Sequence, residues 1–432
     1  MKILSPRGTS DILPDQIAAW QSLETTARTF FKTYGYSELR TPVFEEAGLF
    51  KRSLGETTEV VNKQLLEVKS QRSESEDAGF CLRPEGTAAV VRAYNQHNMG
   101  REEFLSKLFY IGPMFRGERP QKGRLRQFHQ IGAEAIGRGA DHPLLDAEMM
   151  ALAVNILKSS GVSDFKLKIN SLGSAQDKQK FAQWLRDELK GKIGHLSGIC
   201  QDQYERNVFR LLDSKDEACQ EVIKRLDIGL RHLSDSGQAY FSRVREGLDR
   251  LGVEYEVSSQ LVRGLDYYTH TVFEISCAGL GAQDALGAGG RYNGLVEQLD
   301  GGDRRFPQTM GAIGFALGME RILLALEAQG KAVTVKRSLD VFVVSGKPEL
   351  ERETFLLVDL LRRNGICADM DFGDGRAMKK QFEQADKLRA RFVVIVGEGA
   401  AEGFNFTIKD MATGEQRPLL LDHIAKQIIN LL

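Results

Sequence analysis

The chain has 432 residues, 42% of them hydrophobic and 27% charged, and it is too long for one ordinary core, so we expect two or three globular domains. Its 58 basic and 59 acidic residues give a net charge of −1, which excludes binding to nucleic acid by overall charge but not by a local basic face. Five scattered cysteines without a C-x-x-C spacing argue against a disulfide framework and fit a reducing, cytoplasmic compartment. We expect neither a secretory signal nor a membrane-spanning helix.

A long helix and an edge strand are predicted near the N-terminus. The turn-rich segment RGTSDILP ends at Pro14, which with Asp15 opens a helix to about Tyr34 whose apolar residues share one face. The extended segment TPVFE follows, and Pro42 within it is typical of an edge strand. A helix that leads into an edge strand suits a dimer interface, and ordinary packing within one chain explains the same pattern.

Residues 80–87 (FCLRPEGT) predict a corner between a strand and a helix. The strand ends at Pro84 and the helix begins near Thr87, so Glu85 and Thr87 lie where free backbone amides and side chains converge. One interpretation is a binding site at this corner. The other is that Glu85 is an acid favoured by the dipole at a helix N-terminus.

Residues 108–137 are the most unusual segment and predict a long antiparallel hairpin. Two strand-like pieces, LFYIGPMFR and QFHQIGAEAIG, flank the polar loop GERPQKGRLR. A loop with so many cations repels itself unless it is solvated or faces an anion, so either a solvated tip or a phosphate-binding loop is expected. The basic residues are Arg116, Arg119, Lys122, Arg124 and Arg126, against the single acid Glu118.

The returning strand of this hairpin places unusual side chains on one face. With a period of two, Phe128, Gln130, Gly132 and Glu134 point to the same side. A row of an aromatic ring, an amide and a carboxylate is unusual for a strand face that packs into a hydrophobic core. These side chains make a good floor for a polar ligand.

The middle of the chain changes character twice. After a helix and a strand in residues 141–173, residues 174–252 are predicted to be a charged helical insertion, in which no residues suggest chemistry. Residues 261–275 (LVRGLDYYTHTVFEI) then place an arginine, an acid and two tyrosines ahead of a strand. Adjacent tyrosines on an extended chain point to opposite faces, so only one lines a pocket unless the backbone bends, which Gly264 allows. A buried strand with an exposed arginine is the alternative.

Two later segments carry glycines and one arginine of interest. In residues 287–299 (GAGGRYNGLVEQL) the glycines permit close approach of a ligand or of a neighbouring strand. In residues 311–324 a small-residue strand runs into a helix with Arg321 in its first turns, where the helix dipole disfavours a cation. Arg321 is therefore expected to face an anion or an acid, unless it is a plain surface residue. Since no Walker A loop or G-x-G-x-x-G motif is present, any nucleotide site is of another kind.

From residue 339 onward, short strands alternate with helices, which predicts a small, mostly parallel α/β domain at residues 338–432. This part has no catalytic constellation. Its basic residues between positions 376 and 391 suit either a polyanion-binding module or a solvated helix.

Taken together, these segments resemble the histidyl-tRNA synthetases, a family of class II aminoacyl-tRNA synthetases, over nearly the whole length. The resemblance implies an α+β catalytic domain on an antiparallel sheet at 1–330, with the helical insertion at 174–252. It also implies a C-terminal α/β anticodon-binding domain at 338–432 and a homodimer. The matching motifs are RGTSDILP, FKRSLGE, LRPEGT, YIGPMFRGERPQKGRLRQFHQIGAE, LVRGLDYYTHTVFE, AGGRYNGL, GFALGMERI and KKQFEQADK.

The resemblance implies ATP-dependent activation of L-histidine to histidyl-adenylate, then transfer to the 3′ end of histidine tRNA. Negative charge grows on the α-phosphorus, so positioned cations should supply most of the catalysis. Arg116 and Arg263 match the arginines that hold the α-phosphate and carboxylate from opposite sides, and Arg321 matches the one that grips the γ-phosphate. Glu118 and Phe128 match contacts to the adenine. Mg²⁺ is expected on the outer phosphates, held largely by ATP rather than by a protein metal site.

The histidine pocket that the resemblance implies is built from hydrogen-bonding groups. An acceptor at one imidazole nitrogen and a hydroxyl at the other suit histidine, and apolar isosteres would leave these groups unpaired, so no editing domain is needed. Gln121 and Arg126 fall in the loop that, in this family, reaches the extra 5′ guanosine of the tRNA. The residues that match the histidine contacts are Glu85, Gly86, Thr87, Arg116, Gln130, Glu134, Arg263, and one or other of Tyr267 and Tyr268.

The chain departs from the family pattern at two places, and another function competes. LLEVKSQRSESEDAG stands where the family commonly has an aromatic strand, and Gly117 stands where larger residues are usual. A catalytically inactive paralogue acting as regulatory subunit of ATP phosphoribosyltransferase would share the catalytic domain. Such paralogues usually lack the C-terminal domain and part of the LVRGLDYY pattern, and this chain retains both. A synthetase-like domain of a kinase that senses uncharged tRNA would need a kinase domain, and none is visible.

Overall fold

A computed structural model describes residues 2–55, 58, 60–69, 79–262, 267–281, 284–300, 310–331, 339–373, 376–397, 406–420 and 423–432. The chain divides into two compact units, Met1–Val333 and Thr334–Leu432, and each unit has its own buried core. Arg263 and Gly264 lie outside the described residues. Among the helices that are described, none is both long and apolar enough to cross a bilayer.

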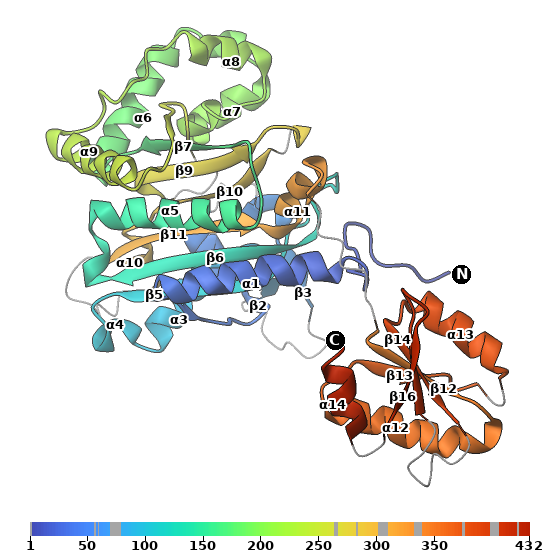
Figure 1. The fold of residues 1–432 in the computed structure, drawn as a ribbon. Coiled ribbons are helices and arrows are strands. Elements are labelled where there is room, and N and C mark those ends of the chain that lie inside the picture. Colours follow the sequence, from blue (N-terminus) through green and yellow to red (C-terminus); the bar gives the residue numbers. More distant parts are fainter. Residues whose placement is uncertain are drawn as a thin grey trace. The chain divides into compact units, whose positions relative to one another are not determined.

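The first unit is organised around a mixed sheet whose central strands are antiparallel (Figure 1), which confirms the predicted antiparallel catalytic sheet. Only the short strands β1 and β8 pair in parallel with their neighbours within the described part of this sheet. The strand order is β1(Ser37–Glu38), β5(Ser106–Phe115), β6(Gln127–Gly137), β11(Gly311–Gly318), β10(Ala285–Arg291), β9(Thr269–Cys277), β7(Phe165–Ser171), β8(Glu256–Val257).

The predicted hairpin of β5 and β6 is confirmed, and its pairing runs from Ser106 opposite Ile136 to Phe115 opposite Gln127. On its other side β6 pairs with β11, whose last residue, Gly318, lies opposite Gln130. The hairpin therefore extends beyond the end of β11. Its tip projects past the sheet because no strand of the sheet continues beside β6 at that point among the described residues.

Helices cover both faces of this sheet. α1(Ile17–Thr33), α5(Pro143–Ser159), α9(Asp235–Arg250) and α11(Met319–Ala328) pack around one large core (Figure 1). α5 is apolar nearly all round, as expected for a helix that lies between the sheet and further helices. α3(Thr87–Gln96) and α10(Leu295–Leu299) belong to the core on the other face, beside the short helix α4(Met99–Glu102).

A small second sheet lies next to α3 in the first unit. It has the order β2(Phe44–Glu46), β4(Phe80–Leu82), β3(Leu66–Val68), so β2 is an edge strand, as Pro42 predicted. α2(Ala47–Leu54) and the short π-helical turn Val60–Gln64 connect β2 to β3.

The segment between β7 and β8 folds as helices with a small core of their own. Ser174 and Asp177 form a capping box at the start of α6, and Asp177 Oδ1 also accepts a hydrogen bond of 3.0 Å from Ser234 N at the start of α9. One buried carboxylate thus joins the beginning and the end of the helical segment. The helices that precede α9 are α6(Ala175–Leu189), α7(Gly198–Arg206) and α8(Glu217–Lys224).

The second unit is an α/β domain with a sheet in the order β13(Ala368–Met370), β12(Val341–Ser345), β14(Phe392–Val396), β15(Phe406–Asp410), β16(Gln416–Leu419). β12 pairs in parallel with β13 and β14, whereas β14–β15 and β15–β16 are antiparallel. The strands β13, β12 and β14 are parallel, as predicted, and the sheet ends in the antiparallel pair β15–β16, which turns at Gly414 with φ of 78°. The helices are α12(Glu351–Arg363), α13(Met378–Lys387) and α14(Ile424–Ile429).

Candidate active site

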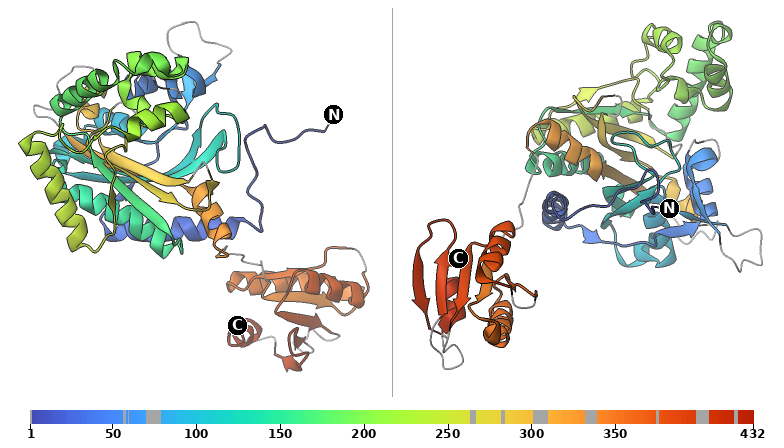
Figure 2. Two further views of the ribbon diagram at one scale, coloured as in Figure 1. Left: turned by 90° about the horizontal axis from the view of Figure 1, so that it is seen from above. Right: turned by 90° about the vertical axis from the view of Figure 1, so that its right-hand side faces the viewer.

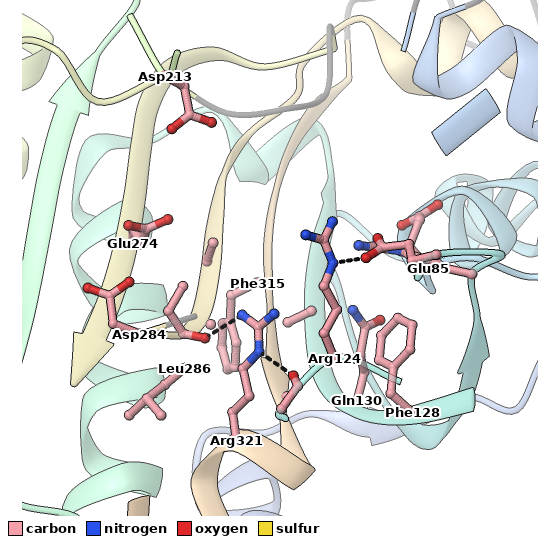
Figure 3. Close-up of a pocket in the computed structure, with 18 of the residues that line it drawn as sticks. Glu85, Arg124, Phe128, Gln130, Asp213, Glu274, Asp284, Leu286, Phe315 and Arg321 are labelled. Carbon is pink, nitrogen blue, oxygen red and sulfur yellow. Dashed lines mark hydrogen bonds and ion pairs between the residues drawn. The ribbon is translucent and has the colours of Figure 1, made fainter. Parts of the chain in front are cut away.

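A cavity of about 920 Å³ is bounded by the hairpin, by β9 to β11 and by the helical insertion. Its size is that of a site for an organic ligand. Figure 3 shows Arg124 and Arg321 pointing into the same space, with Glu274 and Asp284 on the side of Arg321 away from Arg124. The predicted site residues that line the cavity are Glu85, Thr87, Arg116, Glu118, Phe128, Gln130, Tyr267, Tyr268 and Arg321.

Three arginines converge on this cavity, each held by the surrounding chain. Arg116 Nε donates to Pro84 O at 2.9 Å, and the guanidinium lies 5.2 Å from the centre of the Phe128 ring. Arg124 forms an ion pair with Glu118. Arg321 donates from Nε to Gly123 O at 3.0 Å and from Nη1 to Ala285 O at 2.7 Å.

The position of Arg321 agrees with the expectation that it faces an anion or an acid. Burial lowers the pKa of Arg321, and the nearby Arg124 and Arg116 lower it further, while Asp284 and Glu274 oppose them. An arginine keeps its charge in spite of such shifts. The three guanidinium groups therefore repel one another, and an anionic ligand would relieve that repulsion.

The strand-to-helix corner has the arrangement of a helix cap as well as of a cavity wall. The carboxylate of Glu85 accepts hydrogen bonds from Thr87 N at 2.6 Å and from Ala88 N at 2.9 Å, at the start of α3. Burial raises the pKa of Glu85, whereas these amides and Arg116 lower it. The side chain of Glu85 therefore caps α3 and also lines the cavity.

Glu134 lies just behind the cavity wall, fully buried. Its carboxylate accepts from Thr87 Oγ1 at 2.7 Å and from Tyr292 OH at 2.5 Å. Burial raises its pKa to about 8, against these two hydrogen bonds. Gly314 lines the cavity next to it, and a Cβ at that position would overlap Glu134 Oε2, so the position of this carboxylate requires a glycine there.

Two glycines make room for a buried tyrosine beneath the corner. The ring of Tyr110 on β5 occupies the space where a Cβ of Gly86 or of Gly132 would lie. Gly86 is therefore a packing position behind the cavity wall, between Glu85 and Thr87. The phenol is fully buried, which raises the pKa of Tyr110 well above its usual value.

Both Tyr267 and Tyr268 line the cavity, which the sequence predicted only for a backbone that departs from an extended strand at this point. The reason is local: β9 begins at Thr269, so the pair precedes the strand and does not alternate across it. Their ring centres lie 4.7 Å apart, and Tyr267 also contacts Tyr292 edge-on at 5.7 Å. Nearby, Gln130 Oε1 is buried without a hydrogen-bond partner in the described part of the chain.

Some predicted residues lie elsewhere. Gln121 forms the turn at the hairpin tip by pairing with Arg124, and Arg126 donates to the carbonyl oxygens of Glu118 and Arg7. Neither residue lines the cavity. Arg263, a predicted catalytic and histidine-binding residue, is outside the described residues.

Several residues that line the cavity were not predicted as site residues. The sequence indicates Arg124 only as part of a basic loop, and Tyr292 only as part of a glycine-rich motif. The insertion, in which no residues suggested chemistry, supplies residues to one cavity wall. These residues could be found only from the folded structure, because nothing in a helical sequence of mixed charge shows which turn faces a cavity. The additional residues are Arg124, Arg210, Asp213, Ser214, Lys215, Asp216, Glu274, Asp284 and Tyr292.

We expect Glu134→Gln to remove a pH-dependent part of the stability of the first unit. A carboxyl whose pKa rises from 4.5 to about 8 on folding favours the folded state below pH 4.5, and that contribution is lost as the pH rises towards 8. The loss is of the order of 1.4 kcal/mol per pH unit within this window.

Urea unfolding at several pH values, followed by tryptophan fluorescence, measures this effect. Both tryptophans, Trp20 and Trp184, lie in the first unit, so the signal reports on that unit alone. The matched control is Glu148→Gln, which removes a partly exposed carboxylate paired with Lys107. Parallel pH profiles for wild type and Glu134→Gln would contradict the assignment.

Comparison with known proteins agrees with this geometry. A family model described as "Histidyl-tRNA synthetase" matches residues 8–322, and one described as "Anticodon binding domain" matches residues 340–431. A histidine–tRNA ligase of Halothermothrix orenii is 43% identical over 428 residues, which cover 99% of each chain. One of Bacillus subtilis is 41% identical over 427 residues and 98% of each chain.

Solved structures agree as well. The apo histidyl-tRNA synthetase of S. aureus is 36% identical, with a TM-score of 0.80, over 99% of this chain and 100% of that one. A structure titled as an ATP phosphoribosyltransferase regulatory subunit/histidyl-tRNA synthetase from Bacillus halodurans C is 22% identical, with a TM-score of 0.61, over 86% of this chain and 93% of that one. At that identity the likeness concerns the fold alone. The sequence resemblance is thus confirmed, and the chain belongs to the histidyl-tRNA synthetase family.

Proposed function

We propose that the cavity activates L-histidine with ATP and that the chain then transfers the histidyl group to histidine tRNA. The observation that carries this proposal is the convergence of Arg116, Arg124 and Arg321 on one cavity whose floor is polar. In the reaction the histidine carboxylate bonds to the α-phosphorus and the bond to the β-phosphate oxygen breaks, releasing pyrophosphate. Fixed guanidinium groups would stabilise the charge that develops at phosphorus.

The triphosphate and the adenine would lie along the hairpin side of the cavity. Arg116 lies close enough to Glu85 to lower the pKa of that carboxyl, and would hold the α-phosphate and the carboxylate. Arg321 would hold the outer phosphates. Phe128 offers a ring, and Glu118 a carboxylate, for contacts to the adenine.

The histidine would lie between the corner and the tyrosines. The unpaired Gln130 Oε1 and the Glu85 carboxylate are acceptors suited to the α-amino group. Glu134, next to Gly314 of the cavity wall, would read one imidazole nitrogen, and a hydroxyl of the tyrosine pair would read the other. Arg263 would complete the grip on the α-phosphate from the opposite side.

Mg²⁺ would accompany ATP. Carboxylate oxygens are ligands that Mg²⁺ prefers, and Glu274 and Asp284 line the cavity beside Arg321. The described residues contain no group of three or more potential metal ligands, so most ligands would come from phosphates and water. The role of the metal would be to neutralise charge on the outer phosphates.

The tRNA would contact more than one part of the chain. The second unit, at 338–432, would bind the anticodon, in line with its family match. Gln121 and the adjoining hairpin tip would reach the 5′ end of the acceptor stem, and the insertion at 174–252 would lie next to the same cavity within the catalytic domain at 1–330. Binding should weaken with salt, since the total charge is close to neutral and only local basic patches attract the phosphates. A cytoplasmic location fits the five cysteines, none of which forms a disulfide.

A homodimer through the N-terminal helix and the edge strand β2 is part of the proposal. Val43 and Phe44, at the start of this edge strand, are 40% and 54% exposed, so their apolar side chains lie open beside an edge that has no neighbouring strand in the described part of the chain. Phe44→Glu is therefore expected to shift the protein towards monomers in light scattering. Leu251→Glu, at an equally exposed position after α9, is the control. A wild-type chain that is monomeric at micromolar concentration would contradict the dimer.

Histidine-dependent ATP–pyrophosphate exchange without tRNA tests the central proposal. We expect exchange with L-histidine and not with other amino acids. Absence of exchange, with histidine still bound, would overturn the proposal and favour the regulatory subunit of ATP phosphoribosyltransferase. The family match of the second unit and the full-length similarity to named ligases speak for the ligase.

A further inference from the structure

The N-terminal segment lies directly against the base of the hairpin tip (Figure 2). Gly8 O accepts hydrogen bonds from Arg126 N at 2.8 Å and from Gln127 N at 3.3 Å. On the other side of the same stretch, Arg116 N donates to Arg126 O at 2.8 Å. Gly8 therefore contacts the hairpin beyond the point where β11 ends, which is opposite Gln130.

The side chain of Arg126, on the returning arm of the hairpin, also hydrogen-bonds to the outgoing arm and to the N-terminal segment. Its Nε donates to Glu118 O at 3.2 Å, and its Nη1 donates to Arg7 O at 3.4 Å. The guanidinium thus links the outgoing arm of the hairpin to the N-terminal segment. Each acceptor is a backbone carbonyl, so the contact fixes backbone positions.

The fit at Gly8 leaves no space for a side chain. Its φ is 90°, a conformation that residues other than glycine rarely adopt, and a Cβ would lie 2.8 Å from Arg126 Cγ and 2.8 Å from Pro120 Cγ. Backbone and hairpin therefore approach as closely as they can. A larger residue at position 8 would have to push the hairpin tip away.

What the hairpin tip carries makes this contact relevant to the reaction. The tip holds Glu118 and Arg124, which line the cavity, and Gly123 O, which accepts the hydrogen bond from Arg321 Nε. A shift of the tip would therefore displace an ion pair at the cavity and release one anchor of Arg321. A residue that fixes the tip acts on the site through these groups, without touching substrate.

We propose that Arg7 and Gly8 form a positioning strap that holds the hairpin tip, and with it Glu118, Arg124 and Arg321, in place for ATP. The kinetic part of this proposal rests on the proposed adenylation of histidine. The structural part of the proposal, that Arg7 and Gly8 hold the hairpin tip in place, does not depend on that reaction.

Gly8→Ala tests the strap, with Gly35→Ala as its matched control. Gly35 follows α1 with φ of 77°, so it carries the same backbone strain, but no atom lies within 4 Å of its added Cβ. The first readout is the rate of trypsin cleavage at the Lys122–Gly123 bond, followed by mass spectrometry. We expect this cleavage to be roughly tenfold faster in Gly8→Ala and unchanged in Gly35→Ala, since only the first frees the tip to open locally.

The second readout is ATP–pyrophosphate exchange with the full chain. We expect KM for ATP to rise about fivefold or more in Gly8→Ala, with a smaller change in KM for histidine. If Gly8→Ala does not fold, deletion of residues 2–8 removes the strap without adding strain, and the same two changes are expected. Unchanged cleavage and unchanged KM for ATP in either folded variant would overturn the proposal. If wild type shows no exchange, the adenylation proposal fails, while the trypsin comparison still decides whether the strap holds the tip.

Discussion

Arg321→Ala is expected to lower kcat/KM for ATP in pyrophosphate exchange by roughly 10²–10³-fold, as the loss of one preorganised charged donor does elsewhere. The side chain is anchored at both ends of its guanidinium, on Gly123 O and Ala285 O, so its charge is fixed before ATP arrives. A charge that need not reorganise contributes most where negative charge shifts during the reaction. Removing it also removes the hydrogen bonds to these two carbonyl oxygens.

Arg321→Lys is expected to recover only part of this loss. Lysine keeps the charge, but its single ammonium cannot span the two carbonyls as a planar fork does. The measurement is steady-state exchange at varied ATP and fixed histidine, with melting temperatures for both variants.

Arg250→Ala is the control for these two variants. Arg250 is an exposed arginine paired with Glu246 on α9, away from the cavity, and its loss should change little. Full recovery by lysine would show that charge alone matters. Unchanged exchange in Arg321→Ala would place the outer phosphates elsewhere.

Removal of residues 339–432 is expected to lower charging of histidine tRNA by roughly 10²-fold or more while ATP–pyrophosphate exchange changes by less than about threefold. The two units have separate buried cores, and every residue that lines the cavity belongs to the first unit. Loss of a binding module removes the gain in affinity that comes from holding one tRNA at two places. Adenylate formation needs only the first unit.

Charging assays at increasing tRNA concentration distinguish this from a failure of the catalytic fold. If the second unit supplies affinity, high tRNA concentration should restore part of the rate. The first unit should also keep its fluorescence-detected unfolding transition, since both tryptophans are in it. Equal loss of exchange and charging would mean that the second unit supports the catalytic fold itself.

The hairpin and the face of β6 that lines the cavity could be predicted because strand alternation is a local property. Gln130 and Phe128 share a face by period alone, and the glycine and proline loop between the strands marks the turn. Arg321 could be predicted because a cation in the first turn of a helix conflicts with the dipole, and local conflicts often mark sites. The family resemblance then supplied roles that local patterns do not contain.

Other features depend on tertiary contacts and could not be predicted locally. Asp213 lies far along the chain from the hairpin, in a segment whose composition is that of an ordinary solvated helix bundle, yet it lines the same cavity. Whether the tyrosine pair is extended or bent could not be decided from the sequence, and in the structure the strand begins only after the pair, at Thr269. Glu85 showed that two interpretations need not exclude each other, since one carboxylate can cap a helix and line a wall.

The packing of Tyr110 between Gly86 and Gly132 limits how this sequence can change over evolutionary time. Each glycine can gain a side chain only after the ring between them has become smaller, because both added Cβ atoms would occupy the same ring space. A single substitution at either glycine therefore clashes with the ring of Tyr110, so the order in which substitutions occur matters. A lineage that first replaced the tyrosine would open both positions, but it would leave a cavity beneath the corner that presents Glu85 and Thr87.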